Sequence, residues 1–514
     1  FDWRDTPLYM IMIDRFRDGA PDNNPEPTPG AEPSTDWYGG DLQGVTQAIE
    51  DGVFESLGVR ALWISPWNLN PAGAHLAGDG LHGMTGYHGY WPIDSRAVDP
   101  RFGGDEALDA MIRAAHARGI RVMMDLVLNH VHEQHPAFLA HPEWFNTGCL
   151  CGQESCDWTE HRLDCLFATY MPDIDWRVTA AADAFIDDAL YWLERFDVDG
   201  FRVDAVKHVP DLAVANLSTR ISEGFERAGT EVFLLGETAM GWGGHDVADS
   251  LNDYETISRY IGPNLLNGQF DFVLYHAVAT KTWAYDEFDA AMAHPDYWLQ
   301  QSLLHYPADA IMTPYIGSHD TARFVTSATY RGQDEAHAQD LAHHSYAPLP
   351  GAPTDREPYE RMRTALTWLL TIPGLPLLYY GDEYGQFGGH DPDNRRWWRP
   401  EAERSEWETW LYESIARLGT LRASLPALRR GDYLSLKASG SFLAFARRLG
   451  DDLVVVALNH SDAPVSERVV LPQSYVTGPE GSVENRLVES DGASLDTEGL
   501  LISLPARGVG VYVP

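Results

Sequence analysis

Short apolar runs that alternate with helix-like segments recur along most of this 514-residue chain, and this pattern restricts its fold more than any other feature. Eight runs have the length and composition of buried strands. They are residues 8–13, 60–65, 121–126, 200–206, 231–236, 270–274, 310–315 and 376–380. Such an alternation predicts an α/β fold, the (β/α)8 TIM barrel, whose active residues lie at the C-terminal ends of the strands.

The fourth run carries charged side chains inside an apolar segment. Residues 200–208 read Gly-Phe-Arg-Val-Asp-Ala-Val-Lys-His, and a buried strand tolerates charges only where they are paired or functional. Alternation places Arg202 and Asp204 on one face, two residues apart. The pair is either a structural ion pair or a nucleophilic carboxylate held charged by an adjacent guanidinium.

A polar segment rich in His, Cys and Pro interrupts the alternation after the third run. It holds all four cysteines of the chain, Cys149, Cys151, Cys156 and Cys165. An even number of cysteines in a short segment predicts two disulfides in an exported protein. Four thiolates around a zinc ion are the alternative.

The end of the chain changes to short alternating runs separated by turn residues, a pattern typical of an antiparallel β-sandwich. We therefore expect a barrel formed by two parts of the chain, with a loop-rich domain inserted after the third strand. The expected domains are residues 1–128 (barrel, first part), 129–172 (inserted domain), 173–431 (barrel, second part) and 432–514 (β-sandwich).

Acidic residues dominate the composition. A formal net charge of -39 and a pI near 4.7 argue against nucleic acid or an anionic membrane as partner, because phosphates would be repelled. A neutral sugar polymer is not affected by this charge. Nearly all basic residues are Arg, which suits a high-salt solution where ions screen self-repulsion; a GC-rich genome is the alternative explanation.

No apolar run approaches the roughly 20 residues that a membrane-spanning helix needs. The chain begins at Phe1 without Met. We therefore expect the mature form of a secreted protein whose signal peptide is absent from this sequence.

Polar side chains collect where the predicted strands end. They are Asp125, Asn129 and His130 after the third strand, Arg202 and Asp204 on the fourth, Glu237 after the fifth, and His319 and Asp320 after the seventh. This places the carboxylates of Asp204, Glu237 and Asp320 around one barrel mouth. Paired carboxylates in one pocket are what glycoside hydrolysis requires, one to attack the anomeric carbon and one to protonate the leaving oxygen.

These segments resemble the ordered motifs of the α-amylase superfamily, glycoside hydrolase family 13. The matching segments are 125–130, 200–208, 236–237 and 318–320, with 171–175 similar to a fifth motif, and 58–66 and 374–385 similar to the second- and eighth-strand segments. The resemblance implies a retaining mechanism with Asp204 as nucleophile, Glu237 as general acid/base and Asp320 as the carboxylate that holds sugar hydroxyls in the transition state.

The same resemblance implies a set of substrate contacts. They are Arg202, His130, His319, His88, Tyr90, Lys207, Asp393 and Arg395. Arg202 is expected to keep Asp204 ionised. Tyr90, in a segment similar to cyclodextrin glucanotransferases and their α-amylase relatives, is expected to stack on a sugar ring, with a place in an aromatic core as the alternative.

Two Ca²⁺ sites are also implied by the resemblance, since oxygen ligands from separated segments suit Ca²⁺ better than a transition metal. The ligands of the first are Asn129, Asp173 and the carbonyl of His208. The ligands of the second are Asp18, Asn23, Asn24, Gly39 and Asp41. An ordinary Asx-rich turn is the alternative for the second site.

Departures from the family pattern favour hydrolysis over cyclisation. Thr238, Ala239 and Met240 follow Glu237 where glucanotransferases carry an aromatic residue, and the sequence ends after one sandwich. Ser318 stands where the family usually has Asn. We expect a secreted, monomeric, calcium-binding, endo-acting α-amylase that cleaves α-1,4-glucosidic bonds in starch and maltooligosaccharides. The alternatives are a maltogenic amylase, cyclomaltodextrinase or 4-α-glucanotransferase of the same superfamily, or a catalytically silent carbohydrate-binding or transporter-associated relative.

Overall fold

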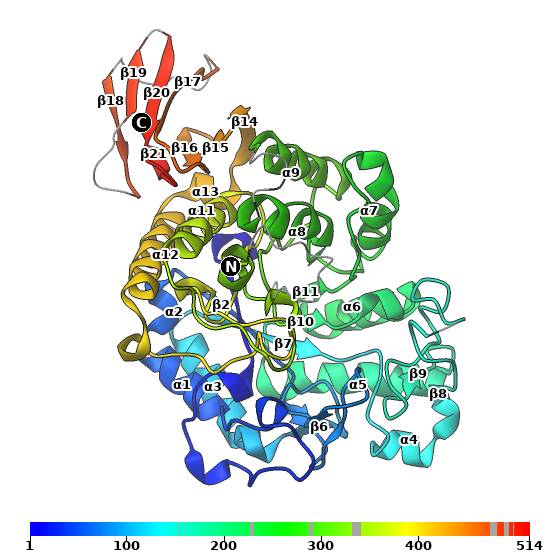
Figure 1. Cartoon of the computed structure of the whole chain (residues 1–514). Helices are drawn as coiled ribbons and strands as arrows, with labels where there is room; N and C mark the ends of the chain where they lie inside the picture. The colour runs from blue at the N-terminus through cyan, green and yellow to red at the C-terminus, as the bar shows by residue number, and fades with distance from the viewer. Residues whose placement is uncertain are drawn as a thin grey trace.

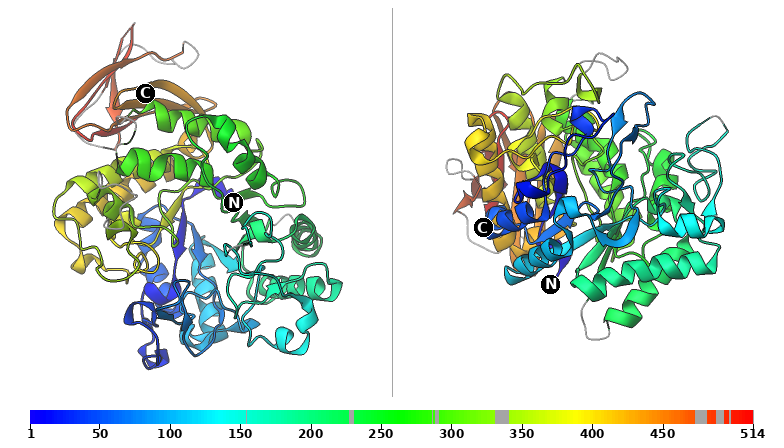
Figure 2. Two further views of the ribbon diagram at one scale, coloured as in Figure 1. Left: turned by 45° about the vertical axis from the view of Figure 1, so that its right-hand side comes forward. Right: turned by 90° about the horizontal axis from the view of Figure 1, so that it is seen from below.

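The computed structural model describes residues 1–153, 155–226, 231–285, 287, 291–330, 341–472, 481–487, 493–496 and 498–513. A ring of parallel strands surrounded by helices forms most of the molecule, and an antiparallel sheet lies against one side of it (Figures 1 and 2). Within the described ranges, no helix combines the length and the apolar character needed to cross a membrane.

Seven parallel strands form the central sheet in the order β12-β11-β10-β7-β2-β1-β13. Their bounds are β1 Leu8–Ile11, β2 Ala61–Ile64, β7 Arg121–Leu126, β10 Gly200–Val203, β11 Phe233–Gly236, β12 Gly268–Gln269 and β13 Leu377–Tyr379. Every residue of β1, β2, β10 and β11 is buried, as expected for parallel strands covered on both faces. Six of the eight predicted runs thus contain strands of this sheet.

Residues 310–315 lie between β12 and β13 and complete the ring. Backbone hydrogen bonds of 2.9–3.0 Å join this segment to residues 267–269 on one side and to residues 375–377 on the other. Pro314 has no N–H to donate, which prevents a regular ladder here. The predicted seventh strand therefore takes its place in the (β/α)8 barrel as an irregular segment with a single bridge at Thr313.

The sixth predicted strand, residues 270–274, is wrong in its position. Strand β12 ends at Gln269, and helix α8 begins at Phe272. The side chain of Asp271 accepts a hydrogen bond of 3.0 Å from the backbone N–H of Leu274, which caps and favours the helix. A short apolar run is compatible with both a buried strand and a buried helix, so the pattern alone could not decide.

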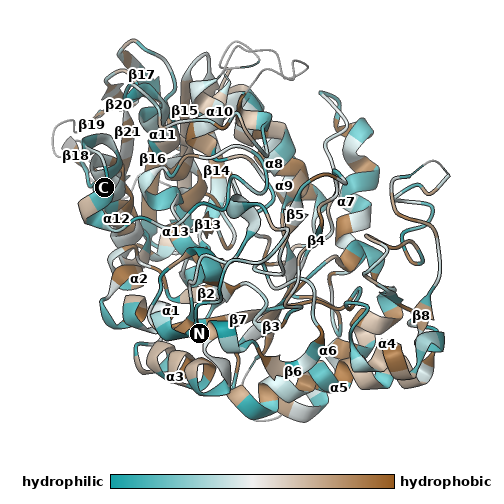
Figure 3. Cartoon of the chain, turned by 60° about the horizontal axis from the view of Figure 1, so that its bottom comes forward, coloured by the Kyte–Doolittle hydropathy of each residue, from teal (hydrophilic) through white to brown (hydrophobic). Residues whose placement is uncertain are grey.

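Helices cover the outside of the ring and bear both hydrophilic and hydrophobic residues (Figure 3). Their bounds are α1 Leu42–Glu50, α2 Val53–Ser56, α3 Gly104–Ala117, α4 Pro136–Ala140, α5 Thr179–Phe196, α6 Asp211–Phe225, α7 Leu251–Ser258, α8 Phe272–Val278, α9 Ala293–His305, α10 Phe324–Thr329, α11 Glu357–Thr371, α12 Glu406–Ser424 and α13 Pro426–Arg430. In α5 the buried residues Phe185, Ile186, Ala189 and Leu193 recur at helical spacing, so one face of the helix packs on the barrel.

Short antiparallel pairs extend from the C-terminal end of the barrel. They are β3 Asn68–Leu69 with β6 Asp94–Val98, β4 His75–Leu76 with β5 Gly83–Met84, and β8 Phe145–Asn146 with β9 Asp173–Ile174. The last pair joins the two ends of the insertion that follows β7. Within this insertion the disulfides are Cys149–Cys156 and Cys151–Cys165, which confirms the disulfide prediction and leaves no free thiolate for a four-cysteine zinc site.

An antiparallel sheet of eight strands follows α13, as the alternating pattern predicts. In chain order these strands are β14 Asp432–Ser439, β15 Phe442–Leu449, β16 Asp452–Asn459, β17 Val465–Val469, β18 Gly481–Asn485, β19 Ala493–Asp496, β20 Gly499–Leu504 and β21 Val509–Val513. The buried guanidinium of Arg447 donates to the carbonyls of Leu428, Gly431 and Thr371. The sheet is therefore anchored to the barrel helices by backbone acceptors.

Candidate active site

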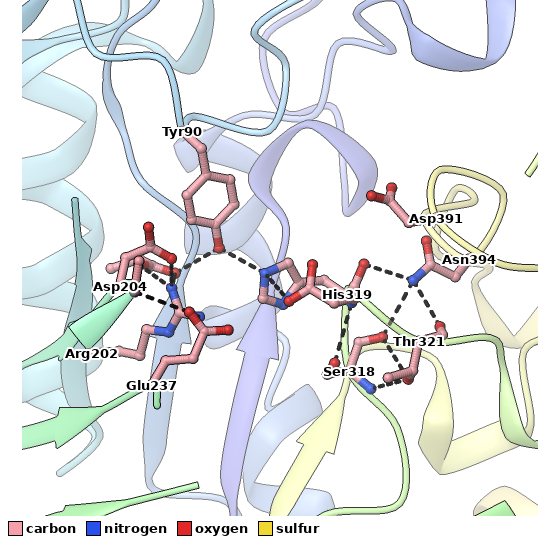
Figure 4. Close-up of polar contacts among 12 residues, drawn as sticks. Tyr90, Arg202, Asp204, Glu237, Ser318, His319, Thr321, Asp391 and Asn394 are labelled. Atoms are coloured by element: carbon pink, nitrogen blue, oxygen red, sulfur yellow. Dashed lines mark hydrogen bonds and ion pairs between the residues drawn. The ribbon is translucent and has the colours of Figure 1, made fainter. Parts of the chain in front are cut away.

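Arg202, on strand β10, is the centre of a cluster of three carboxyl groups (Figure 4). Its Nη1 lies 2.9 Å from Asp125 Oδ1 and 2.5 Å from Asp204 Oδ1, and its Nη2 lies 2.9 Å from Glu237 Oε2. Because β7, β10 and β11 are neighbours in the sheet, their C-terminal ends bring the three acids together.

Burial and charge act in opposite directions on these carboxyl groups. Burial raises the pKa of Asp204 well above its ordinary value, the guanidinium of Arg202 lowers it, and nearby Glu237 and Asp125 raise it. Burial likewise raises the pKa of Asp125 to about 6, against the effect of Arg202. The low pKa expected for Asp204 from Arg202 alone is thus offset by burial.

Tyr90 links this cluster to the motif at the end of the seventh segment. Its hydroxyl donates to Asp125 Oδ2 at 2.8 Å and lies 2.9 Å from Nε2 of His319. The Tyr90 and His319 rings are stacked, 5.6 Å between centroids and 6° between planes. Nε2 of His319 is 3.3 Å from Asp320 Oδ2, and the Asp320 side chain is half exposed. The predicted catalytic acids Asp204, Glu237 and Asp320 are therefore brought to one barrel mouth.

Arg395 connects Asp320 to a loop after β13. Its Nη2 lies 3.3 Å from Asp320 Oδ1, and its Nη1 lies 3.0 Å from Asp391 Oδ1. Asn394 holds this loop against the site by donating to the backbone carbonyl of His319 at 2.7 Å. Arg395 thus lies beside Asp320 at the barrel mouth, with Asp391 as its second acidic partner.

Asp393 is a correction to the predicted sugar contacts. Its carboxylate is buried and accepts hydrogen bonds from Nε and Nη2 of Arg396, at 2.8 and 2.6 Å, and from the backbone N–H of Gly389 at 2.6 Å. These donors leave little capacity for a sugar hydroxyl. Asp391, which the sequence reasoning missed, lines the cleft instead. The sequence contained a sign of Asp391, because this acid precedes Arg395 by four residues and can pair with it.

Two adjoining cavities form a cleft above the carboxyl cluster. The first, of about 430 Å³, is lined by Asp204, Glu237 and Asp320 together with His130, Lys207, His208, His319 and Arg395, and by Tyr90, Trp91, Trp158, Phe167, Met171, Ala205 and Ala239. The second, of about 690 Å³, runs past His88, Tyr90 and Asp391 to the β4–β5 hairpin. Trp158 and Phe167, contributed by the insertion, were not predicted, since its sequence has no periodic pattern.

A third, smaller cavity of about 160 Å³ lies on the other side of Glu237. Its wall is aromatic and includes Phe272, Tyr275 and Tyr315. Tyr275 and Tyr315 are stacked, with 4.4 Å between centroids and 6° between planes. An aromatic surface is therefore available beside Glu237 even though Ala239 is not aromatic.

The first predicted calcium site lies where the insertion meets the barrel. Ile174 N–H donates to the carbonyl of Asn129 at 2.9 Å, which aligns Asn129 with Asp173. Asn129 Oδ1 is buried without a hydrogen-bond partner among the described residues, and burial raises the pKa of Asp173 well above its ordinary value. His208 lines the first cavity together with His130, the neighbour of Asn129 in the chain, and its Nδ1 donates to the carbonyl of Arg162 at 2.9 Å. An unpartnered oxygen beside a buried carboxylate fits a cation.

The second predicted calcium site is a loop before α1. Asp41 caps this helix, its Oδ1 accepting from Gly44 N–H at 2.6 Å, and Asn24 Nδ2 donates to Asp18 Oδ2 at 2.8 Å. Asp18 Oδ1 and Asn23 Oδ1 are buried without partners among the described residues. Gly39 is required here, because a Cβ would lie 2.4 Å from the Asn24 side chain. The convergent oxygens fit a Ca²⁺ ion.

A pair of imidazoles at the edge of the cleft predicts acid sensitivity. Nε2 of His132 lies 3.1 Å from Nε2 of His75, and burial, then the neighbouring His75, lowers the pKa of His132 to about 4. As the pH drops, His132 takes up a proton in the unfolded chain near pH 6.5 but in the folded chain only near pH 4. The free energy of unfolding therefore falls between about pH 6.5 and 4. We expect Tm to fall more steeply over this range for the wild type than for His132→Gln. Equal slopes in thermal melts would contradict this.

Comparisons with known proteins agree with this geometry. The family described as "Alpha amylase, catalytic domain" matches residues 10–413. The cyclomaltodextrin glucanotransferase of Bacillus sp. (strain 1-1) is 27% identical over 98% of this chain and 67% of its own length. The cyclomaltodextrinase of Geobacillus thermopakistaniensis is 26% identical over 99% of this chain and 77% of its own length.

Among solved structures, the α-amylase of Geobacillus thermoleovorans, complexed with acarbose, superposes with a TM-score of 0.79 at 26% identity, covering 100% of this chain and 98% of that chain. A cyclomaltodextrin glucanotransferase with a three-domain ABC distribution gives 0.77 at 23% identity, over 99% of both chains. The catalytic-domain family matches most of the chain, and the matched part includes the cluster around Arg202. This protein therefore belongs to the α-amylase family and is an amylolytic glycosidase.

Proposed function

We propose that this protein is an endo-acting α-amylase that cleaves α-1,4-glucosidic bonds in starch and maltooligosaccharides with retention of configuration. The observation that carries this proposal is the cluster in which Asp204 and Glu237 contact the same guanidinium at the base of an open cleft. An open cleft admits an internal segment of a polymer. The short distance of both acids to one cation suits the double displacement of retaining enzymes.

In this mechanism Asp204 attacks the anomeric carbon while Glu237 protonates the departing glucosidic oxygen. Glu237 then takes a proton from the water that releases the sugar from Asp204. The backbone N–H of Ala205 donates to Glu237 Oε2 at 3.1 Å, which orients this carboxyl group. Asp320 and His319 bind the hydroxyls of the sugar at the cleaved bond.

The remaining substrate contacts lie along the cleft. His130 and Lys207 line the first cavity, and His88 and Tyr90 line the second. Tyr90 lines both cavities, and its ring is proposed to contact the apolar face of a sugar. Arg395 and Asp391 bind hydroxyls of the donor sugar.

A transferring or cyclodextrin-acting enzyme is the second candidate. The aromatic wall of Phe272, Tyr275 and Tyr315 beside Glu237 supports it, because stacking would hold a sugar acceptor in competition with water. Chain length does not separate the candidates, since the three-domain glucanotransferase noted above matches this chain over its whole length.

The products formed over time from soluble starch and from a cyclodextrin decide between these candidates. Mixed linear maltooligosaccharides from starch, slow attack on cyclodextrin and an inactive Asp204→Asn control support the endo-amylase. Fast ring opening, one dominant short product or products longer than the substrate would instead support the second candidate.

Ca²⁺ is proposed at both oxygen-rich sites. Asn129, Asp173 and the carbonyl of His208 would hold one ion, and Asp18, Asn23, Asn24, Gly39 and Asp41 the other. The unpartnered oxygens of Asn129, Asp18 and Asn23 support this assignment. The ions would join the insertion to the barrel and fix the loop before α1.

Chelation is expected to lower Tm by several degrees, because an ion that binds only the native state stabilises it. Calorimetry with and without a calcium chelator measures the shift. Asp173→Asn should remove the part of the shift that belongs to the first site, and Asp18→Asn the part that belongs to the second. An unchanged Tm after chelation would contradict both sites.

A matched pair of substitutions tests the donor-side acid. Asp391→Asn is expected to raise KM for maltooligosaccharides about tenfold, because a hydrogen bond to a charged group is worth roughly 1.5–3 kcal/mol. Asp393→Asn should change KM less and Tm more, since Asp393 is bound to Arg396 and Gly389. Steady-state kinetics with thermal melts checks both, and the reverse ranking of KM would restore Asp393 as the sugar contact.

Secretion and a monomeric state are proposed with this activity. The two disulfides, Cys149–Cys156 and Cys151–Cys165, suit an oxidising compartment. Salt tolerance also stays a prediction, supported by the net charge of -39.

A further inference from the structure

Cys151, Cys165 and His208 form a compact buried cluster in the wall of the cleft. Their two Sγ atoms and a ring nitrogen of His208 lie within 4.8 Å of one another. In the oxidised chain the sulfurs are bonded to each other and are not metal ligands. We propose that reduction of this disulfide converts the cluster into a site for Zn²⁺ with two thiolates and the imidazole of His208, next to the first calcium site, which would use only the main-chain carbonyl of that residue.

The backbone keeps the two cysteines together without the disulfide. Cys151 N–H donates to the carbonyl of Leu166 at 2.9 Å, and Leu166 N–H donates to the carbonyl of Cys149 at 2.9 Å. Cys165 N–H is held separately by the carbonyl of His161 at 3.0 Å. None of these bonds involves sulfur, so the two thiols remain neighbours after reduction.

His208 has one ring nitrogen available as a metal ligand. Its Nδ1–H donates to the carbonyl of Arg162 at 2.9 Å, which leaves the lone pair of the neutral ring on Nε2. A backbone carbonyl on the second ring nitrogen is the usual way in which proteins orient histidine ligands. The ring is also held edge-on by Phe167, 4.9 Å between centroids and 89° between planes.

A dithiol supplies the electrons that reduce the disulfide. It gives two electrons to the Cys151–Cys165 bond and leaves as its own disulfide, while both cysteines take up protons. Zn²⁺ then displaces the two thiol protons and forms two Zn–S bonds and one Zn–N bond. Since His208 also lines the first cavity, water from the cleft can complete the tetrahedron.

Cobalt titration of the reduced full-length protein, in calcium buffer freed of transition metals, tests this proposal. Co²⁺ replaces Zn²⁺ and reports thiolate ligands by charge-transfer absorption. Reduced Cys149→Ser/Cys156→Ser is expected to bind one equivalent with thiolate bands, and reduced Cys151→Ser/Cys165→Ser to bind about a hundredfold more weakly. The oxidised wild type should show no thiolate bands. Equal binding by both variants, or binding only with all four cysteines, would overturn the proposal.

His208→Gln tests the third ligand, because it removes the imidazole and retains the main-chain carbonyl. We expect its Co²⁺ affinity in the reduced form to fall about tenfold or more, and unchanged affinity would overturn the three-ligand site. Thermal melts test the same site without His208→Gln, in case that variant is less stable. Zn²⁺ should raise Tm of reduced Cys149→Ser/Cys156→Ser and not that of reduced Cys151→Ser/Cys165→Ser. The absence of this difference would also overturn the proposal.

Discussion

Replacement of Asp204 by Asn is expected to lower kcat on maltooligosaccharides by about 10⁴-fold or more, with little change in Tm. The amide has the shape of the carboxylate and keeps an oxygen for Arg202, whose Nη1 lies 2.5 Å from Asp204 Oδ1. It is too weak a nucleophile to attack the anomeric carbon. Steady-state kinetics and a thermal melt of the same preparation measure both quantities. A kcat within about tenfold of the wild type would contradict the nucleophilic role.

Glu237→Gln is the matched variant that separates the nucleophile from the acid. Fluoride leaves a sugar without protonation, so an α-maltosyl fluoride bypasses the need for a general acid. Glu237→Gln is expected to release fluoride far faster, relative to the wild type, than it hydrolyses starch. Asp204→Asn should remain inactive on both substrates. Recovery of Asp204→Asn on the fluoride would reverse the two assignments.

Arg202→Met is expected to have the second largest effect, on stability and activity together. The guanidinium is 1% exposed and contacts Asp125, Asp204 and Glu237. Removing the cation from a buried charge network costs about 3–5 kcal/mol. Loss of Arg202 also removes the effect that lowers the pKa of Asp204, so the acid limb of the kcat profile should move to higher pH. Denaturant unfolding and a pH profile measure these two changes.

Arg323→Met is the control for Arg202→Met. Arg323 is equally buried, and its Nη1 lies 3.2 Å from Asp382 Oδ1 and donates to the carbonyl of Tyr380 at 2.7 Å. It should lose a comparable free energy of unfolding without a shift of the acid limb. The same shift in both variants would show that the pH effect of Arg202→Met comes from general destabilisation.

The neighbourhood of the catalytic acids could be predicted from the sequence because parallel topology dictates it. Asp125, Arg202 and Glu237 are distant in the chain, yet each lies at or near the C-terminal end of a strand, and neighbouring strands bring these ends to one rim. The buried strands themselves have clear apolar runs. Their order and the helices between them follow from the alternation alone.

Positions in loops could not be predicted with the same accuracy. Asp391 and Asp393 are two residues apart in a loop without a periodic pattern, and only the hydrogen bonds of Asp393 with Arg396 show which acid faces the cleft. Trp158 and Phe167 reach the cleft through the fold of the insertion, which no short pattern encodes. The prediction of a strand at residues 270–274 was wrong because the apolar run is compatible with a strand, whereas the Asp271 cap favours a helix.

The disulfides of the insertion determine which proteolytic fragments stay covalently linked. Both bonds close between residues 149 and 165, so neither ties the insertion to the barrel, and contacts such as Arg162 Nη1 with the carbonyl of Lys207, at 3.0 Å, must do so. A protease cut between residues 152 and 164 would leave two pieces joined by sulfur, visible only on a reducing gel. A cut at residues 136–145 would leave two pieces without a covalent link, which a denaturing gel separates without a reductant, so the two kinds of break can be told apart.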